Sequence, residues 1–237
     1  MAKKGAKKKQ KRLSTHTARL MKRKEKTFTI KLKPGPHNFK QSVPLGFLVR
    51  DLLKLSINRK ETKNILNEGK IKVDGKTRKS TKFPVGLFDF VSIEGTKENY
   101  RIILDSKGRL KTIKTEETKP VKLCKITGKK VNGKKEIQLN TNDGRTFIEK
   151  ETELKVGDTI KISVPEQKIL EKIIQKKGNL AYVTGGSHAG EKAEIQEIIK
   201  GDINKYKTVK LKNKEKEFTT TAANIFVIGE KKAEIEL

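Results

Sequence analysis

One glycine-rich loop of this chain has the residue types of a binding site, in the segment VTGGSHAGEKAEI at residues 183–195. Its glycines, Gly185, Gly186 and Gly190, allow close backbone approach and positive φ angles. The loop is therefore suited to expose backbone N–H groups to RNA, with His188 at its tip stacking or forming hydrogen bonds. A plain hairpin that makes no contact is the competing interpretation.

The same loop fails the test for a nucleotide-binding P-loop. Gly185 and Gly190 have the spacing of G-x-x-x-x-G, but the lysine that should follow is replaced by Glu191. An acidic side chain at that position would repel phosphate. The preceding strand also leads into no clear helix, so the pattern argues against nucleotide binding.

Residues that could catalyse a reaction form no recognisable set. Ser187 and His188 are adjacent, so their side chains point apart, and no G-x-S-x-G turn accompanies them. Acidic pairs such as Glu116-Glu117 lie in polar stretches typical of solvated loops. Cys124 lies in the alternating segment VKLCKI and is expected to be a small buried residue. The sequence therefore predicts no enzyme.

Metals, cofactors and membranes are not predicted as partners either. Cys124 is the only cysteine, which excludes an internal disulfide and favours a reducing, intracellular setting. His16, His37 and His188 are far apart in sequence and form no metal-ligand motif. No apolar stretch approaches the roughly 20 residues of a membrane-spanning helix, and the N-terminus lacks the apolar segment of a secretory signal. We expect a soluble, cytoplasmic protein.

Charge is the strongest feature of the sequence. Lys and Arg number 57 against 28 Asp and Glu, which gives a formal net charge of +29 at pH 7. Such an excess favours a polyanionic partner, because phosphates release condensed counterions on contact. Residues 1–26 carry +11 of this charge and the rest of the chain carries +18. We expect the tail to be disordered until it is bound, and the folded part to contact RNA as well.

The candidate phosphate contacts lie in the tail, on two predicted helices and on the hairpin that follows them. Single exposed cations contribute little, so a solvated surface is the alternative for any one of them, whereas their joint density favours a binding patch. The candidates are Lys8, Lys9, Lys11, Arg12, Arg19, Lys22, Arg23, Lys24, Arg50, Arg59, Lys60, Lys63, Lys70, Lys72, Lys76, Arg78 and Lys79. Gly185, Gly186, His188 and Gly190 complete the predicted RNA-binding set.

Two helices and a hairpin should position the central part of this set. Apolar residues recur at helical spacing over 43–57, and Asn58 with Glu61 has the form of a capping box for a second helix. The segment KIKVDGKTRK at 70–79 then alternates apolar and basic residues around a tight turn at Asp74-Gly75. A helix-plus-sheet module is therefore expected.

Beyond residue 105 the hydrophobic period is close to two. Turn signals at Gly128, Asn132-Gly133, Asp143-Gly144 and Gly157-Asp158 recur about every ten residues, as in small β-barrels. We predict an α+β protein with a disordered basic tail. Its expected parts are a tail and Pro/Gly loop at 1–41, an RNA-binding module at 42–105, a central β-barrel domain at 106–172 and a second β domain at 173–237.

Two segments resemble known RNA-binding elements. The order helix, helix and then the hairpin with IKVDGK resembles the S4 RNA-binding domain, in which two packed helices present cations to RNA. The glycine loop at 183–195 resembles the KOW motif, a β-hairpin of ribosomal proteins and transcription-elongation factors.

The resemblance extends along nearly the whole chain. Segments similar to the small-subunit ribosomal protein family S4e occur in the family's order, namely GPH at 35–37, KVDGK at 72–76, SIEGTKENYRIILDSKGR at 92–109, KLCKI at 122–126, DGRT at 143–146, GDTIKI at 157–162 and ANIFVIG at 223–229. The resemblance implies a structural protein of the small ribosomal subunit that binds its RNA beside neighbouring ribosomal proteins and supports translation. A transcription-elongation factor with a KOW motif, or an RNA-modifying enzyme with an S4 domain, is the alternative.

Overall fold

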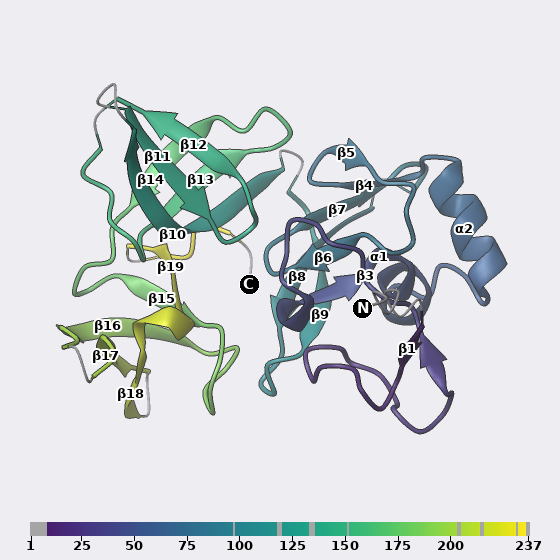
Figure 1. Ribbon diagram of the computed structural model, residues 1–237, viewed down its shortest axis with the longest axis horizontal. Helices are drawn as coiled ribbons and strands as arrows, with labels where there is room; N and C mark the ends of the chain where they lie inside the picture. The colour runs from purple at the N-terminus through teal and green to yellow at the C-terminus, as the bar shows by residue number, and fades with distance from the viewer. Residues whose placement is uncertain are drawn as a thin grey trace, which may run out of the picture.

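The computed structural model describes residues 9–96, 98–117, 120–132, 136–150, 152–202, 205–213, 216–230 and 232–235. These residues form mainly β-structure, with three five-stranded antiparallel sheets and little helix (Figure 1). The expected α+β class is therefore borne out in part, since helix contributes less of the fold than was expected. The reason is that the 43–57 segment gives only short helical turns, so α2 (Arg59–Asn67) is the one described helix of more than five residues.

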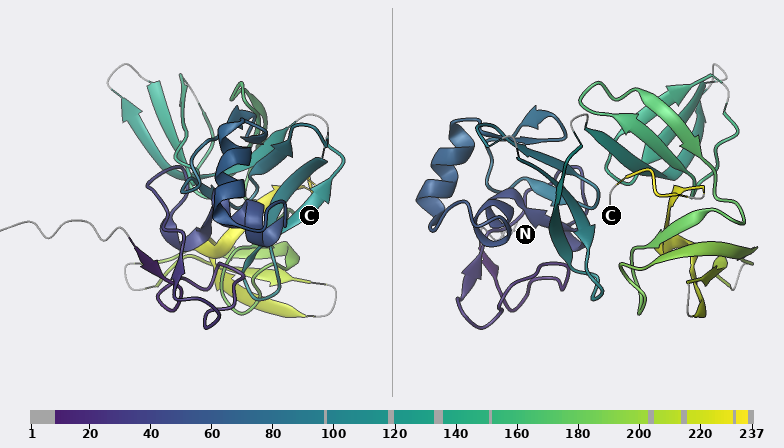
Figure 2. Two further views of the ribbon diagram at one scale, coloured as in Figure 1. Left: turned by 90° about the vertical axis from the view of Figure 1, so that its right-hand side faces the viewer. Right: turned by 180° about the vertical axis from the view of Figure 1, so that it is seen from behind.

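The sheets define three units, named here for use below. The N-terminal unit is residues 9–117, the central unit is 120–173 and the C-terminal unit is 174–235. Figure 1 shows the N-terminal unit on the right and the other two stacked on the left, and Figure 2 shows the same division from behind.

From residue 42 onward, the N-terminal unit contains one five-stranded sheet beside a short two-stranded one. The strand order of the larger sheet is β5-β4-β7-β8-β9, and the smaller sheet pairs β3 with β6. The strands are β3 (Ser42–Pro44), β4 (Ile71–Val73), β5 (Lys76–Thr77), β6 (Pro84–Gly86), β7 (Phe90–Ile93), β8 (Glu98–Leu104) and β9 (Leu110–Thr115). Since β9 pairs with β8, the boundary expected at residue 105 falls inside a hairpin, and the N-terminal unit continues beyond it.

Local sequence signals position the helices and the first hairpin of this unit. Apolar residues from 45 to 49 are buried in α1 (Leu45–Phe47) and the π-helical turn η2 (Leu48–Leu52). The Asn58 side chain accepts from the N–H groups of Lys60 and Glu61, which confirms the capping box of α2. Asp74 and Gly75 both have positive φ, as the expected tight turn between β4 and β5 requires.

The central unit is a curled sheet with the order β12-β11-β10-β13-β14. An ion pair of 2.8 Å between Lys172 on β14 and Glu149 on β12 links its two edge strands. Gly128 was expected in a turn but lies within the long strand β10, where a bulge between Ile126 and Gly128 bends the strand instead. The strands are β10 (Val121–Asn132), β11 (Glu136–Thr141), β12 (Thr146–Glu149), β13 (Thr159–Ser163) and β14 (Ile169–Ile173).

The C-terminal unit is a second curled sheet, with the order β18-β17-β16-β15-β19. The last strand returns to pair with the first, and a short 3-10 turn, η3 (Ala222–Asn224), precedes it. The strands are β15 (Leu180–Val183), β16 (Lys192–Ile199), β17 (Thr208–Lys212), β18 (Glu217–Thr221) and β19 (Ile225–Gly229).

Residues 9–26 of the basic tail are ordered, contrary to the expectation for this segment. The strands β1 (Gln10–Lys11) and β2 (Phe28–Thr29) pair, and the Leu110 N–H donates to the Ala18 carbonyl. Arg12 and Arg19 are each only 3% exposed, and the Arg12 guanidinium donates to the Lys22 carbonyl at 2.7 Å. These contacts with the folded body supply the burial that composition alone did not reveal. Residues 1–8 lie outside the described residues.

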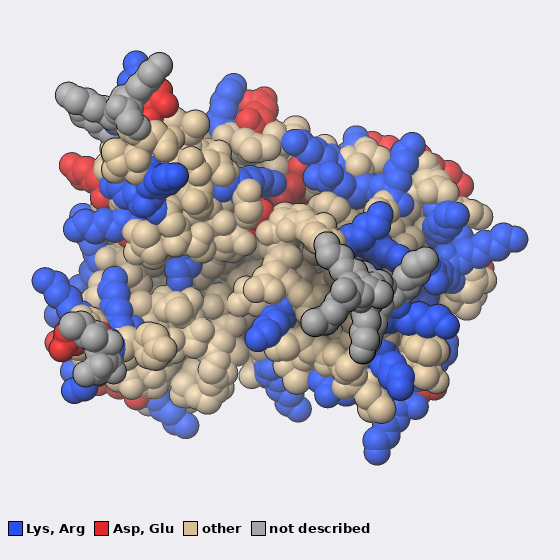
Figure 3. Space-filling model, in the orientation of Figure 1, with Lys and Arg blue, Asp and Glu red and all other residues tan. Residues whose placement is uncertain are grey.

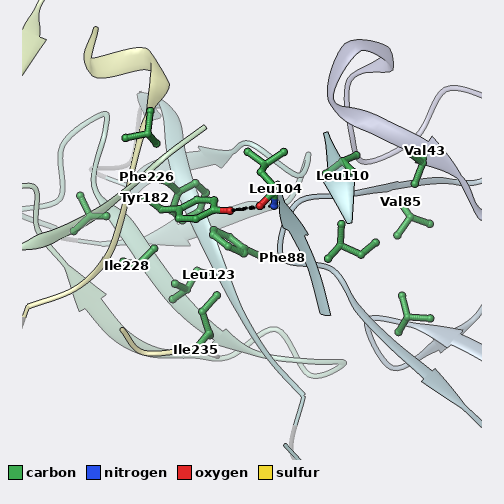
Figure 4. Packing of buried hydrophobic residues seen from close by; sticks show 14 of the residues in the cluster. Val43, Val85, Phe88, Leu104, Leu110, Leu123, Tyr182, Phe226, Ile228 and Ile235 are labelled. Carbon is green, nitrogen blue, oxygen red and sulfur yellow. Dashed lines mark hydrogen bonds between the residues drawn. The ribbon is translucent and has the colours of Figure 1, made fainter. Parts of the chain in front are cut away.

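One hydrophobic cluster runs from the N-terminal unit into the other two (Figure 4). Phe88 packs against Phe226 of β19, with ring centroids 4.9 Å apart and the rings nearly perpendicular. The Tyr182 hydroxyl of β15 accepts from the Leu104 N–H at 3.0 Å and donates to the Leu104 carbonyl at 3.1 Å. The three units therefore share a core, which contributes to holding them together.

Candidate RNA-binding surface and buried ion-pair network

The predicted cations of α2 and the following hairpin form an exposed basic surface. Figure 3 shows Lys and Arg side chains gathered over the part of the molecule that carries α2 and β5 in Figure 1. Within the described residues, five of these cations have no carboxylate partner and are at hand for phosphate. They are Arg59, Lys60, Lys63, Lys76 and Lys79, named here the α2 cations.

Other predicted cations of the same region are already paired with protein groups. Arg50 is bonded to Asp51 at 2.7 Å, Lys70 to Glu68 at 2.6 Å, and Lys72 forms an ion pair with Glu94. The Arg78 guanidinium lies over the Phe83 ring, 4.5 Å from its centroid. A phosphate would have to compete with these contacts, so we expect these four side chains to contribute less than the α2 cations.

The N-terminal cations divide in the same way. Lys9, Lys11, Lys22, Arg23 and Lys24 are exposed, and Arg23 donates to the Thr15 carbonyl at 3.1 Å. Burial lowers the pKa of Arg19 to about 10, and its guanidinium lies over the Phe39 ring. The buried Arg12 and Arg19 are thus held inside the protein, contrary to their expected place among the phosphate contacts. Lys8 lies outside the described residues.

The glycine loop between β15 and β16 serves mainly to join two units. The Gly190 N–H donates to the Val183 carbonyl, so it is not free for an anion. A Cβ atom at Gly190 would lie 2.5 Å from the carbonyl oxygen of Asp105, between β8 and β9. Gly186 is exposed, and His188 stacks on Phe218 with ring centroids 4.0 Å apart. Of the four predicted loop residues, Gly186 is therefore exposed and His188 is partly exposed.

Replacing Gly190 by alanine should therefore destabilise the protein more than the same change at Gly186. Both residues have positive φ, so both variants carry backbone strain of about 1 kcal/mol. Only Gly190→Ala adds a clash with the backbone, so its free energy of unfolding, measured in urea, should fall by roughly 2–4 kcal/mol. Equal losses in the two variants would show that the loop does not depend on its contact with Asp105.

A buried network of charges joins the N-terminal and central units. The ammonium group of Lys122, on β10, lies 2.8 Å from Asp74, 2.5 Å from Asp89 and 3.2 Å from Asp143. Lys122 is 1% exposed. Burial disfavours its charge, but the three carboxylates outweigh that cost and raise the pKa of Lys122 well above its usual value.

Further side chains complete this network, which we call the Lys122 network. Arg145 contacts Asp74 at 2.8 Å and Asp143 at 3.3 Å, and His37 contacts Asp89 at 2.8 Å. The Cys124 thiol is fully buried, as expected, and lies 3.4 Å from Asp143. Burial and the adjacent carboxylate raise the pKa of that thiol, which leaves it protonated and unreactive.

Glycine positions bring the two units close enough for these contacts. The ring of His37 packs on Gly86, where an added Cβ atom would lie 2.4 Å from the ring. Gly75, in the turn between β4 and β5, faces Pro165 of the central unit, whose Cδ would lie 2.9 Å from an added Cβ. The Asp74-Gly75 turn therefore points into the protein and not toward solvent.

The stability of the protein should fall below about pH 4 because of this network. Burial opposes ionisation of Asp143, but Lys122, Thr141 and Arg145 lower its pKa to about 2. An unfolded Asp has a pKa near 3.9, so on acidification the unfolded chain takes up this proton first. About 2–3 kcal/mol should be lost between roughly pH 5 and pH 2, measured by urea unfolding. In the variant Asp143→Asn, this part of the dependence of the free energy of unfolding on pH should be absent. The same dependence on pH in the variant and in the unsubstituted protein would contradict the prediction.

The described residues can be searched for groups of metal-ligating side chains and for helices that could span a membrane. Within the described ranges, no three His, Cys, Asp or Glu side chains are grouped to hold a metal ion. None of the described helices has the length and apolar character needed to cross a bilayer.

Comparison with known proteins assigns the family. The model of Ribosomal family S4e matches residues 96–169. Two curated relatives are the small ribosomal subunit proteins eS4 of Methanocaldococcus jannaschii, 44% identical over all of both chains, and of Methanococcus vannielii, 43% identical over 97% of each. The crystal structure of the 30S ribosomal protein S4e from Thermoplasma acidophilum is 39% identical, covers 80% of this chain and 96% of its own, and has a TM-score of 0.70. The chain therefore belongs to Ribosomal family S4e.

Proposed function

We propose that this chain is a structural constituent of the small ribosomal subunit and binds small-subunit ribosomal RNA in the cytoplasm. The observation that carries the proposal is the full-length similarity to relatives named as small ribosomal subunit proteins. The net charge of +29 supports it, because a chain so basic is matched by a polyanion.

The α2 cations are the main phosphate contacts in this proposal. They are exposed and free of carboxylate partners within the described residues, and Lys and Arg side chains gather over the region of α2 and β5 in Figure 3. The exposed tail cations Lys9, Lys11, Lys22, Arg23 and Lys24 add to them. Contacts of this kind read the shape and backbone of folded RNA and not its base sequence.

The three units supply different parts of this function. The N-terminal unit, which holds the S4-like helix and hairpin, contributes the basic surface, and the C-terminal unit contributes Gly186 and His188 from the KOW-like loop. The Lys122 network holds the central unit against the N-terminal unit. Neighbouring ribosomal proteins are expected partners of the remaining surface.

The relatives reported above are named as ribosomal proteins and lend no support to a transcription-elongation factor or an RNA-modifying enzyme. Residues 120–235, beyond the N-terminal unit, are occupied by the two curled sheets. The ribosomal function is therefore the one proposed.

Sedimentation of cell lysate on sucrose gradients tests the proposal. The chain should migrate with small-subunit RNA at moderate salt and remain with it at high salt, since an integral protein is held by more than surface charge. A chain that stays at the top of the gradient, or leaves at modest salt, would contradict the proposal. A pull-down that recovers RNA polymerase without ribosomal subunits would favour the elongation factor.

A further inference from the structure

A cleft of about 800 Å³ lies where the three units meet. Its lining includes Gln41 and Leu104 from the N-terminal unit, Asn142 from the central unit, and Gly186 and Asn224 from the C-terminal unit. The hollow between the two halves of the molecule is visible in Figure 3. Its volume falls within the range of about 300–1,000 Å³ that is typical of sites for small organic groups.

The cleft is lined by cations, and none of its described lining residues is Asp or Glu. Lys40, Lys107, Lys125 and Lys207 all line it. The ammonium group of Lys125 donates to the carbonyls of Ala222, Ala223 and Ile225, and burial lowers the pKa of Lys125 to about 8, with Lys207 adding repulsion. Lys40 and Lys107 are exposed and have no carboxylate partner in the described part of the chain. The field in the cleft thus favours an anion.

The walls of the cleft combine apolar surface with amide groups. Leu87, Val156 and Ala223 contribute exposed or partly exposed apolar surface, and Asn142, Gln175 and Asn224 contribute amides. The Gln175 carboxamide oxygen accepts from Lys207 at 3.0 Å, while its buried Nε2 has no hydrogen-bond partner among the described residues. Apolar surface beside an amide donor without a partner suits a heterocyclic base, which has a π-face and polar edges.

We propose that one unpaired nucleotide of the bound RNA inserts into this cleft, with its base between the apolar walls and its phosphate at the lysines of the rim. The inference rests on the proposed RNA-binding function and adds a single-stranded contact to the duplex contacts of the α2 cations. An RNA helix presents paired, stacked bases and does not fit a cleft of this volume, whereas a base extruded from a loop or bulge does.

Site-specific photo-crosslinking tests the proposal on the full chain bound to small-subunit RNA. A photoreactive benzoylphenylalanine is placed at Ala223, an exposed residue of the cleft, or at Lys63 on α2. The probe at 223 should crosslink to one nucleotide in a loop or bulge, and the probe at 63 to RNA near a helix. Crosslinking from 63 but not from 223, or from 223 only to paired nucleotides, would overturn the insertion. Crosslinking from neither position would instead count against the proposed RNA-binding function.

A filling substitution gives a second measurement. Ala223→Trp places an indole in the cleft and should weaken RNA binding about tenfold, since base stacking on protein groups has an effect of this size. Thr219→Trp, at an exposed position of β18 that does not line the cleft, is the matched control and should leave affinity unchanged. Thermal unfolding of both variants checks the fold. Equal affinities in two folded variants would overturn the proposal.

Discussion

Replacing Lys122 by methionine should lower the free energy of unfolding by about 3–5 kcal/mol. Methionine keeps most of the side-chain volume but removes the charge that faces Asp74, Asp89 and Asp143. Without Lys122, the three buried carboxylates would keep only the contacts that Arg145 makes with Asp74 and Asp143 and that His37 makes with Asp89. The change is measured by urea unfolding followed by circular dichroism at pH 7.

A surface lysine supplies the control for that experiment. Lys168 forms an ion pair with Glu166 at 2.9 Å, but both side chains are largely exposed, so Lys168→Met should cost less than about 1 kcal/mol. Adding Asp89→Asn to Lys122→Met should recover part of the loss, because one uncompensated charge is removed with the other. A loss below 1 kcal/mol in Lys122→Met, or no coupling with Asp89, would show that the network is not what joins the two units.

The network explains how units with small cores are held in one arrangement. The central unit has its own hydrophobic cluster, which includes Ile126, Leu139 and Ile160 and is separate from the larger cluster. Only a few residues of the central unit, such as Leu123 and Ile173, belong to the hydrophobic cluster that is shared with the other two units. Buried ion pairs contribute directional contacts where apolar area is limited, which favours one relative orientation over others.

Local features of the fold were predictable because their causes are local. The capping box of Asn58 and Glu61 depends on residues three apart, and the turn at Asp74-Gly75 depends on positive φ at adjacent residues. Cys124 is buried, as expected of a small apolar side chain in a strand, although its neighbours Lys122 and Leu123 are buried as well. The exposure of Arg59, Lys60 and Lys63 was likewise visible in their helical spacing.

The Lys122 network was not predictable from patterns of this kind. Lys122 and Asp74 are 48 residues apart, and Lys122 resembles any other lysine in a chain with 57 Lys and Arg. A weak signal existed, since GPH, KVDGK, KLCKI and DGRT were among the segments that carried the family resemblance. Their residues His37, Asp74, Lys122 and Asp143 meet in this network, so these segments reflect contact between units.

The ordered conformation of residues 9–26 was not predicted either, because it also depends on contacts that the composition of the segment does not reveal. The sequence predicted Arg12 and Arg19 as solvated cations. In the structure, Arg12 donates a hydrogen bond to the Lys22 carbonyl, and the Arg19 guanidinium lies over the Phe39 ring. The aliphatic part of an arginine side chain can be buried while its guanidinium contacts a carbonyl group or an aromatic ring. The amino-acid composition of a segment does not show which of these partners will be present. Basic residues of such a segment therefore have to be divided by burial before any is assigned to RNA.

Neutralising three of the α2 cations should have the largest effect on RNA binding. The variant Arg59→Gln/Lys60→Gln/Lys63→Gln removes three exposed charges that have no carboxylate partner among the described residues. The slope of log affinity against log salt should fall by about two to three, and affinity near 0.1 M salt should fall about a hundredfold. Filter binding to small-subunit RNA over a series of salt concentrations measures both.

The matched control removes the same charge from another part of the surface. Lys168, Lys210 and Lys212 are exposed, and each already forms an ion pair with a glutamate, so their change to Gln should alter the slope by less than one. If the control weakened binding as much as the α2 variant, net charge alone would account for affinity and no particular surface would be involved. A selective effect of the α2 variant would place the phosphate contacts on this helix, because both variants lose three positive charges and differ in where those charges lie and whether they are paired.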